Sequence, residues 1–229
     1  MSEIYLIRHG QASFGKEDYD QLSDKGYTQS KLLANFLNKT GVRFDSFYLG
    51  ENKRHRQTFL PSENLLKEHE EIKIRSAFNE FEFEDVLREV IPYLINDEPE
   101  FKKEVDRMFE SNRAFQLVFE RSVFKWLEQP DRFDVISWRG FVERVEKEVS
   151  KVMIDEGSSK KIAIFSSGGV IAAIVQLALN ISDKEALKLS WQILNCSITK
   201  LKFNKDNFIL TGFNETSFLA VEEKMLTFR

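Results

Sequence analysis

The sequence predicts an α/β fold in which a mostly parallel sheet is covered by helices on both faces. Uninterrupted apolar runs at residues 4–7 and 162–165 are typical of strands that are buried on both faces. Segments with apolar residues at helical spacing separate these runs, so strands and helices alternate along the chain. This alternation favours a three-layer α/β/α architecture.

The first part of the chain is expected to supply three strands and two helices. Leu32, Leu33, Phe36 and Leu37 lie at helical spacing, and Gly41 is a typical helix stop. In order, we expect a strand at 4–7, this helix, a strand at 44–49, a helix at 53–69 and a short strand at 72–74. Residues 76–99 are acidic and contain two prolines, so we expect them to be irregular.

The second part is expected to add helices and three more strands. In order, we expect helical segments within 100–128, a helix around 141–152, a strand at 162–165 followed by a helix, and strands at 193–203 and 208–213. No repeat or linker divides the chain, which favours one domain over residues 1–229. We expect residues 76–137 or so to form a helical insertion over the strand ends, where such sheets bind ligands.

Composition narrows the class of protein. The 33 basic and 37 acidic residues are mixed along the chain and give a net charge of −4, which argues against nucleic-acid binding. The apolar runs are too short for a signal peptide or a membrane span. A single cysteine, Cys196, fits a reducing compartment and is expected to be a small buried residue. We therefore expect a cytoplasmic protein with no membrane partner.

The tripeptide Arg8-His9-Gly10 directly follows the first expected strand. The arginine fork fits phosphate oxygens, and a histidine ring nitrogen can attack phosphorus to form a phosphoenzyme. Glycine lets the backbone turn sharply and approach an anion. The tripeptide alone is equally compatible with an ordinary strand-end loop.

The order of further motifs resembles the histidine phosphatase superfamily, also called phosphoglycerate mutase-like. In that family RHG follows the first strand, L-[ST]-x-x-G-x-x-Q opens the first helix, and R-x-x-Q-T follows the second strand. The residues that match the last two patterns are Leu22, Ser23, Gly26, Gln29, Arg54, Gln57 and Thr58. An acidic residue follows the third strand, where the stretch FNEFEFED offers Glu80.

This resemblance implies a role for each candidate residue. His9 would be the nucleophile, Arg8 and Arg54 would hold the phosphoryl oxygens, and Glu80 would be the general acid and base, with Glu82 and Glu84 as competitors. Arg56 would point away from Arg54 on a helix and is the spare arginine. Gln11 and Ser13 are expected to donate or accept hydrogen bonds at the rim of the pocket.

One position departs from the family pattern. The family turn S-H-G-G carries a second histidine that donates to a phosphoryl oxygen, whereas this chain reads Ser166-Ser167-Gly168-Gly169. The two remaining histidines, His55 and His69, are expected at the solvated surface and not near this turn. Ser167 would then be a weaker, neutral phosphate ligand, while the helix N-terminus at Gly168 would still attract an anion.

The departure leaves several hypotheses open. The chain is either a slow, metal-independent phosphomonoesterase without a cofactor or an inactive pseudophosphatase that binds a phosphorylated ligand. Its partner would be a phosphorylated small molecule or a phosphoprotein. A phosphoglycerate mutase is disfavoured, because nothing in the sequence points to that specificity. Ser167 as a nucleophile fails, because the turn lacks G-x-S-x-G.

Overall fold

The computed structural model describes residues 1–13, 20–67, 72–220 and 224–228. The chain forms two compact units, one made of Met1–Glu80 with Arg144–Arg229 and the other of Phe81–Glu143. Among the described residues, no helix is long and apolar enough to cross a membrane.

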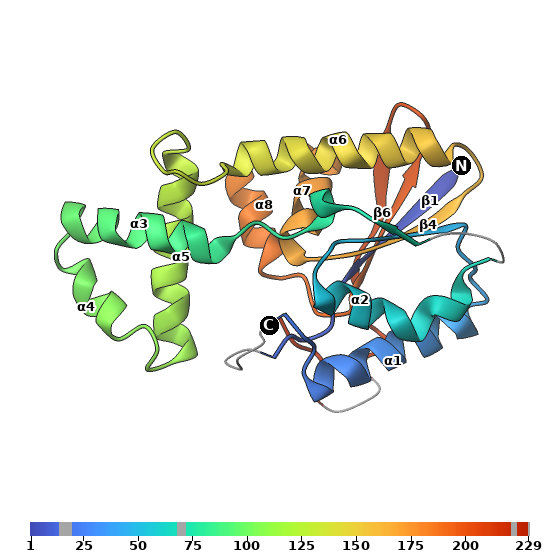
Figure 1. The fold of residues 1–229 in the computed structure, drawn as a ribbon, viewed down its shortest axis with the longest axis horizontal. Helices are drawn as coiled ribbons and strands as arrows, with labels where there is room; N and C mark the ends of the chain where they lie inside the picture. Colours follow the sequence, from blue (N-terminus) through green and yellow to red (C-terminus); the bar gives the residue numbers. More distant parts are fainter. Residues whose placement is uncertain (14–19, 68–71, 221–223, 229) are drawn as a thin grey trace. The chain divides into compact units, whose positions relative to one another are not determined.

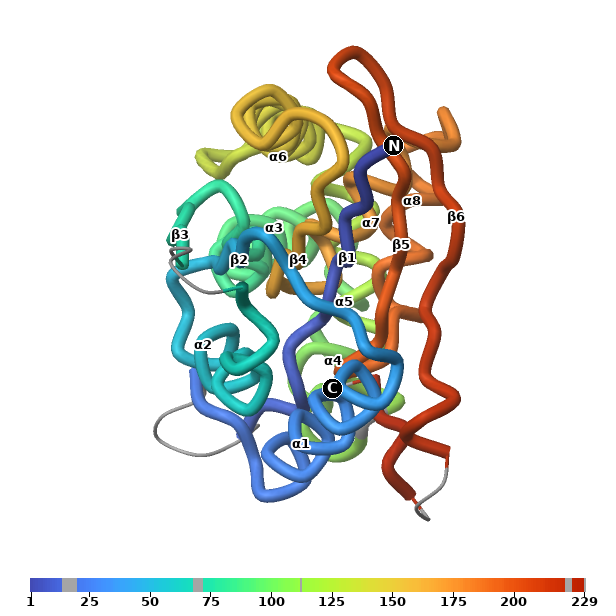
Figure 2. The backbone as a smooth tube through the Cα atoms, turned by 90° about the vertical axis from the view of Figure 1, so that its right-hand side faces the viewer, coloured from blue at the N-terminus to red at the C-terminus, as the bar shows by residue number. Residues whose placement is uncertain are grey.

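The first unit is built on a six-stranded sheet with the order β3-β2-β4-β1-β5-β6, which can be followed across Figure 2. The strands are β1 (Ser2–Arg8), β2 (Ser46–Leu49), β3 (Ile72–Ile74), β4 (Lys161–Ser166), β5 (Ile198–Phe203) and β6 (Phe208–Glu215). Strands β1, β2, β3 and β4 pair in parallel, whereas β5 is antiparallel to both β1 and β6. The predicted mostly parallel sheet is confirmed.

Helices cover both faces of this sheet (Figure 1). On one side lie α1 (Asp24–Lys39) and α2 (Lys53–Phe59), and on the other lie α6 (Trp138–Glu156), α7 (Gly168–Leu179) and α8 (Asp183–Ser190). Ile7, Phe47 and Phe165 pack with α1 and α2 in one buried cluster. Their neighbours Leu6 and Ile164 are also fully buried, and successive strand residues point to opposite faces. Burial on both faces explains the uninterrupted apolar runs.

The second unit is helical and contains α3 (Phe83–Asp97), α4 (Phe101–Asp106) and α5 (Asn112–Glu128). Its core includes an aromatic group of Phe81, Trp126, Trp138 and Phe141, with ring centroids between 5.4 and 6.5 Å apart.

Two expectations about individual elements were wrong. Residues 83–97 form a helix, with Pro92 inside it, because Val86, Val90 and Leu94 make a buried stripe. Such burial offsets the cost of about 3 kcal/mol for a proline in a helix interior. The strand expected from residue 193 begins only at Ile198, because Cys196 has a positive φ of 57°. Cys196 is buried as predicted, and burial raises the pKa of its thiol.

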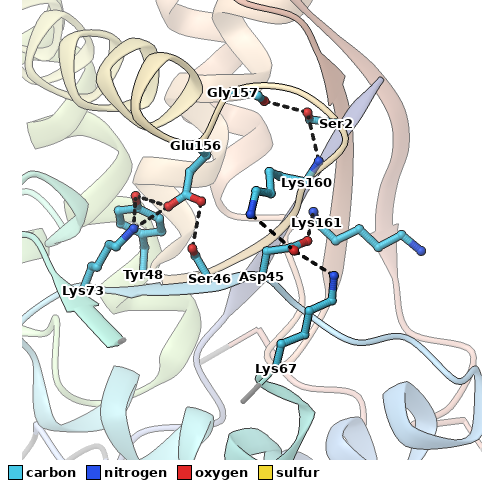
Figure 3. Close-up of polar contacts among 10 residues, drawn as sticks. All are labelled: Ser2, Asp45, Ser46, Tyr48, Lys67, Lys73, Glu156, Gly157, Lys160 and Lys161. Atoms are coloured by element: carbon cyan, nitrogen blue, oxygen red, sulfur yellow. Dashed lines mark hydrogen bonds and ion pairs between the residues drawn. The ribbon is translucent and has the colours of Figure 1, made fainter. Parts of the chain in front are cut away.

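A polar network ties the amino ends of the parallel strands together (Figure 3). The Glu156 carboxylate, at the end of α6, accepts hydrogen bonds from Ser46, Tyr48 and Lys73 at 2.6 to 2.8 Å. Asp45 accepts from the backbone N–H of Lys161 at 2.8 Å. These bonds fix the edge of the sheet opposite to the one that follows Arg8.

Candidate active site

The candidate site is assembled where β1 and β4 end side by side. Arg8 pairs with Ser166 in the parallel register, and the His9 N–H donates to the Ser166 carbonyl at 2.9 Å. The residue that follows β4 is Ser167, the N-cap residue of α7. The RHG tripeptide and the serine turn, far apart in the sequence, are therefore neighbours in the sheet.

His9 is held as a neutral imidazole with a defined tautomer. Its Nδ1 lies 2.7 Å from the Gly10 carbonyl oxygen, which only accepts, so Nδ1 carries the proton. Burial lowers the pKa of His9 well below its usual value, and the charges of Arg54 and Arg8 lower it further. The lone pair is consequently on Nε2, and His9 as a whole is 7% exposed.

The loop that carries His9 is fastened from two sides. The Gly10 N–H donates to Thr58 Oγ1 at 2.9 Å, and Asn195 Nδ2 donates to the His9 carbonyl at 3.0 Å. The first turn of α1 also packs onto the loop so closely that a Cβ on Gly26 would lie 2.2 Å from the Gln11 carbonyl oxygen. The glycine of the L-[ST]-x-x-G pattern is thus explained by backbone packing.

The two predicted arginines approach His9 but already have partners. Arg8 Nη1 donates to the Ile193 carbonyl, and Arg54 Nη1 pairs with Asp20 Oδ1 at 2.8 Å. Asp20 Oδ2 also accepts from the Lys53 N–H at 2.8 Å, at the start of α2. Nothing in the sequence marked Asp20. Arg56 is exposed, as its helical position predicted.

Glu80 reaches the turn that contains Ser167. Its Oε2 accepts from the Gly169 N–H at 2.9 Å, so the carboxylate already occupies one donor at the N-terminus of α7. The segment just before Glu80 is also fixed to the end of β4, because Ser166 Oγ donates to the Phe78 carbonyl at 2.7 Å. The competitors Glu82 and Glu84 are exposed and belong to the helical unit.

The remaining candidates have varied surroundings. Gln11 Oε1 accepts from Ser23 Oγ at 3.0 Å, which links the loop to the N-cap of α1. Ser13 is buried, and its N–H donates to the Gln21 carbonyl at 2.8 Å. Gly168 lies beside the Arg8 guanidinium, since a Cβ there would be 3.6 Å from Arg8 Nε.

The expectation for His55 was wrong. This side chain is fully buried, its Nε2 lies 2.8 Å from Ser167 Oγ, and its ring centroid is 5.7 Å from that of His9. The charged stretch KRHRQ suggested a surface position, but His55 shares a helix face with the buried Thr58 and Phe59. That periodicity could have revealed it. His69 lies outside the described residues.

Fold and site together define an α/β protein with a neutral histidine, whose pKa two arginines lower, at the carboxyl ends of its parallel strands. Residues 4–216 match the histidine phosphatase superfamily (branch 1), and the chain belongs to this family. No curated protein matches it in sequence.

Solved structures with the same fold have low sequence identity to this chain. A variant phosphoserine phosphatase from Entamoeba histolytica in complex with phosphoserine is 18% identical, with a TM-score of 0.65 over 96% of this chain and 100% of that one. The alpha-ribazole phosphatase from Shigella flexneri is 15% identical, with a TM-score of 0.61 over 93% and 96%. A mycobacterial glucosyl-3-phosphoglycerate phosphatase is 16% identical, with a TM-score of 0.60 over 94% and 99%.

Proposed function

We propose that this chain hydrolyses phosphomonoesters through a phosphohistidine intermediate on His9. The observation that carries the proposal is the state of His9. Its Nδ1 proton is held by the Gly10 carbonyl, and burial with the neighbouring arginines lowers its pKa, so Nε2 presents a lone pair at neutral pH. Family membership supports the same activity.

The proposed reaction has two steps. His9 Nε2 attacks phosphorus, the P–O ester bond breaks, and Glu80 gives a proton to the leaving alkoxide. Glu80 then takes a proton from water as its oxygen attacks the phosphohistidine, which releases phosphate and regenerates neutral His9. Arg8 and Arg54 stabilise the charge that develops on the phosphoryl oxygens.

The proposed turnover is slow, because Ser167 stands where the family pattern has a second histidine. Loss of one strong transition-state donor typically costs about 10²- to 10³-fold in rate. Gln11, Ser13, Ser167 and Gly168 are the proposed minor ligands of the phosphoryl group.

The first experiment measures hydrolysis of p-nitrophenyl phosphate by the purified protein in the presence of a chelator. We expect slow turnover, its loss in His9→Ala, and an acid-labile phosphoenzyme that His9→Ala does not form. Arg56→Gln is the matched control, because this exposed arginine lies on the same helix as Arg54. Hydrolysis that survives in His9→Ala would contradict the proposal.

The second candidate is a pseudophosphatase that binds a phosphorylated small molecule or a phosphoprotein without turnover. It is favoured by the partners already present in the pocket, since Asp20 pairs with Arg54 and Glu80 takes the Gly169 N–H. Vanadate binding that requires His9 and Arg54, without any hydrolysis, would establish this alternative. Phosphoserine, α-ribazole 5′-phosphate and glucosyl-3-phosphoglycerate, suggested by the names of the solved relatives, form a first panel of ligands for either candidate.

A further inference from the structure

The hydroxyl of Ser167 is not used to cap the helix that it precedes. Ser23, Ser111 and Ser182 each accept a backbone N–H at the start of their helices. Ser167 is the N-cap residue of α7, yet its side chain makes no such bond within the described part of the chain. Its hydrogen-bonding partner is His55 Nε2, at 2.8 Å.

The backbone around His55 leaves a slot for the imidazole ring. A Cβ on Gly50 would lie 2.3 Å from His55 Nδ1 and 2.7 Å from the Phe78 carbonyl oxygen, so only glycine leaves room for the ring. Both residues of the pair are buried: His55 is fully buried and Ser167 is 1% exposed. A buried polar pair of this kind costs free energy unless its members satisfy each other.

His55 is neutral at physiological pH. Burial lowers its pKa to about 3 and the Arg54 charge acts in the same direction, while a hydrogen bond with the Gly50 backbone partly opposes them. A neutral ring whose Nε2 already contacts Ser167 Oγ is not a second cation for the phosphoryl group. Its influence on a bound phosphate therefore passes through the serine.

We propose that His55 is a positioning residue that orients the Ser167 hydroxyl toward the phosphoryl oxygens; this inference rests on the function proposed above. Phosphoryl oxygens only accept hydrogen bonds, so Ser167 must give them its hydroxyl proton. Oγ then accepts from Nε2–H of His55, and Nδ1 carries the lone pair. The competing tautomer places the proton on Nδ1, beside the Gly50 backbone, whose hydrogen bond raises the pKa of this ring, so the ring-nitrogen measurement below decides between the two.

We call the chain from His55 through the Ser167 hydroxyl to the bound anion the relay. A double-mutant cycle on vanadate binding tests it. We expect Ser167→Ala to weaken binding about 5-fold and His55→Leu about 3-fold, the scale of neutral hydrogen bonds. In the Ser167→Ala background, His55→Leu should weaken vanadate binding by less than a further 2-fold, because the hydroxyl that His55 orients is already absent. His55→Gln should recover most of the loss, since its amide N–H can donate to Oγ, and Arg56→Gln on the same helix is the control.

The outcomes separate the two proposals, because vanadate binding needs no turnover. If His55→Leu weakens vanadate binding by the same factor in the wild type and in Ser167→Ala, the two residues act independently. That result would overturn the positioning role of His55 and leave the phosphatase proposal intact. A wild-type protein that binds no vanadate would overturn both.

A measurement on the unmutated protein guards against variants that fail to fold. The chain has three histidines, so ¹⁵N spectra of their rings can be assigned with His55→Gln. The relay predicts that His55 carries its proton on Nε2 in the vanadate complex, and a proton on Nδ1 would overturn it. If His55 were purely structural, vanadate binding would leave the ¹⁵N signals of its ring unchanged.

Discussion

His55 and Ser167 share the space beside His9. With Nε2 only 2.8 Å from Oγ and both side chains buried, there is no room for a second imidazole at position 167. A variant that restores the family's second histidine must therefore also remove the one that α2 supplies. This constraint follows from packing and does not depend on the chemistry proposed for the pair.

Ser167→His alone is expected to lower turnover of p-nitrophenyl phosphate, because the new ring collides with His55 and displaces the turn. Combined with His55→Ala, which vacates the slot, Ser167→His should turn over about 10²-fold faster than the single variant, as expected for a regained strong donor. Steady-state kinetics and thermal unfolding of the two variants test this. A single variant that is faster than the double one would show that the two rings do not compete.

Sequence reasoning at the residue scale succeeded where a motif placed the backbone and was wrong where burial depended on a partner. The Arg54 charge lowers the pKa of His9, so the segments that carry these two residues lie near each other. His55 was missed because three charged residues surround it, while the glycine that admits its ring lies five positions earlier. Asp20 carried no signal, since its contact with Arg54 joins residues 34 positions apart.

At the scale of elements, α1 fixes the loop that carries His9 through backbone packing. Gly26→Ala would place a Cβ 2.2 Å from the Gln11 carbonyl oxygen, so either α1 or the loop must move. We expect a loss of about 1 to 3 kcal/mol in unfolding free energy, the usual cost of overpacking, together with a drop in turnover. Urea unfolding and steady-state kinetics measure the two effects.

Gly140→Ala is the matched control for this variant. A Cβ there meets nothing nearer than 3.4 Å, and the site lies in α6. Alanine is favoured over glycine in a helix by up to about 1 kcal/mol, so this variant should be as stable as the wild type or more so. Equal stability of Gly26→Ala and Gly140→Ala would contradict the packing argument.

The elements that the sequence predicted poorly are those where local composition and tertiary packing disagree. Helix α3 was missed because its acidic residues and Pro92 outweighed a buried stripe with a spacing of four residues. The first residues of the expected 193–203 strand instead form a loop, in which the Cys196 N–H donates to the Arg8 carbonyl at 3.0 Å. That contact holds the backbone of Arg8 in place, and residues 193–197 are therefore not part of the strand.

For the whole molecule, the parallel strands carry the candidate site at their carboxyl ends and a polar network at their amino ends. The carboxyl edge gathers His9, Glu80 and Ser167, whereas the amino edge is closed by the Glu156 network of Figure 3. The alternation of strands and helices was enough to predict the layers. It could not predict which distant residues meet at either end of the strands. Alternation indicates that helices cover the strands, but it does not indicate which strands are neighbours.

The amino edge should make stability depend on pH below neutrality. Burial alone would raise the pKa of Glu156, but hydrogen bonds from Lys73, Tyr48 and Ser46 outweigh it and the net shift is downward. Since the folded-state pKa lies below the unfolded value, this carboxylate contributes its full stability above the unfolded pKa of about 4.3 and loses it as pH falls through the folded one.

Glu156→Gln keeps the shape of the side chain but removes its charge. We expect it to lower the unfolding free energy at pH 7 by about 1 to 3 kcal/mol, the cost of leaving buried donors poorly matched. The difference from the wild type should shrink as pH falls below about 4.3, because the wild-type carboxylate then becomes protonated as well. Urea unfolding across pH 3 to 8 or so measures this difference, with exposed Glu146→Gln on the same helix as control. A difference that stays constant with pH would mean that the charge of Glu156 does not stabilise the sheet edge.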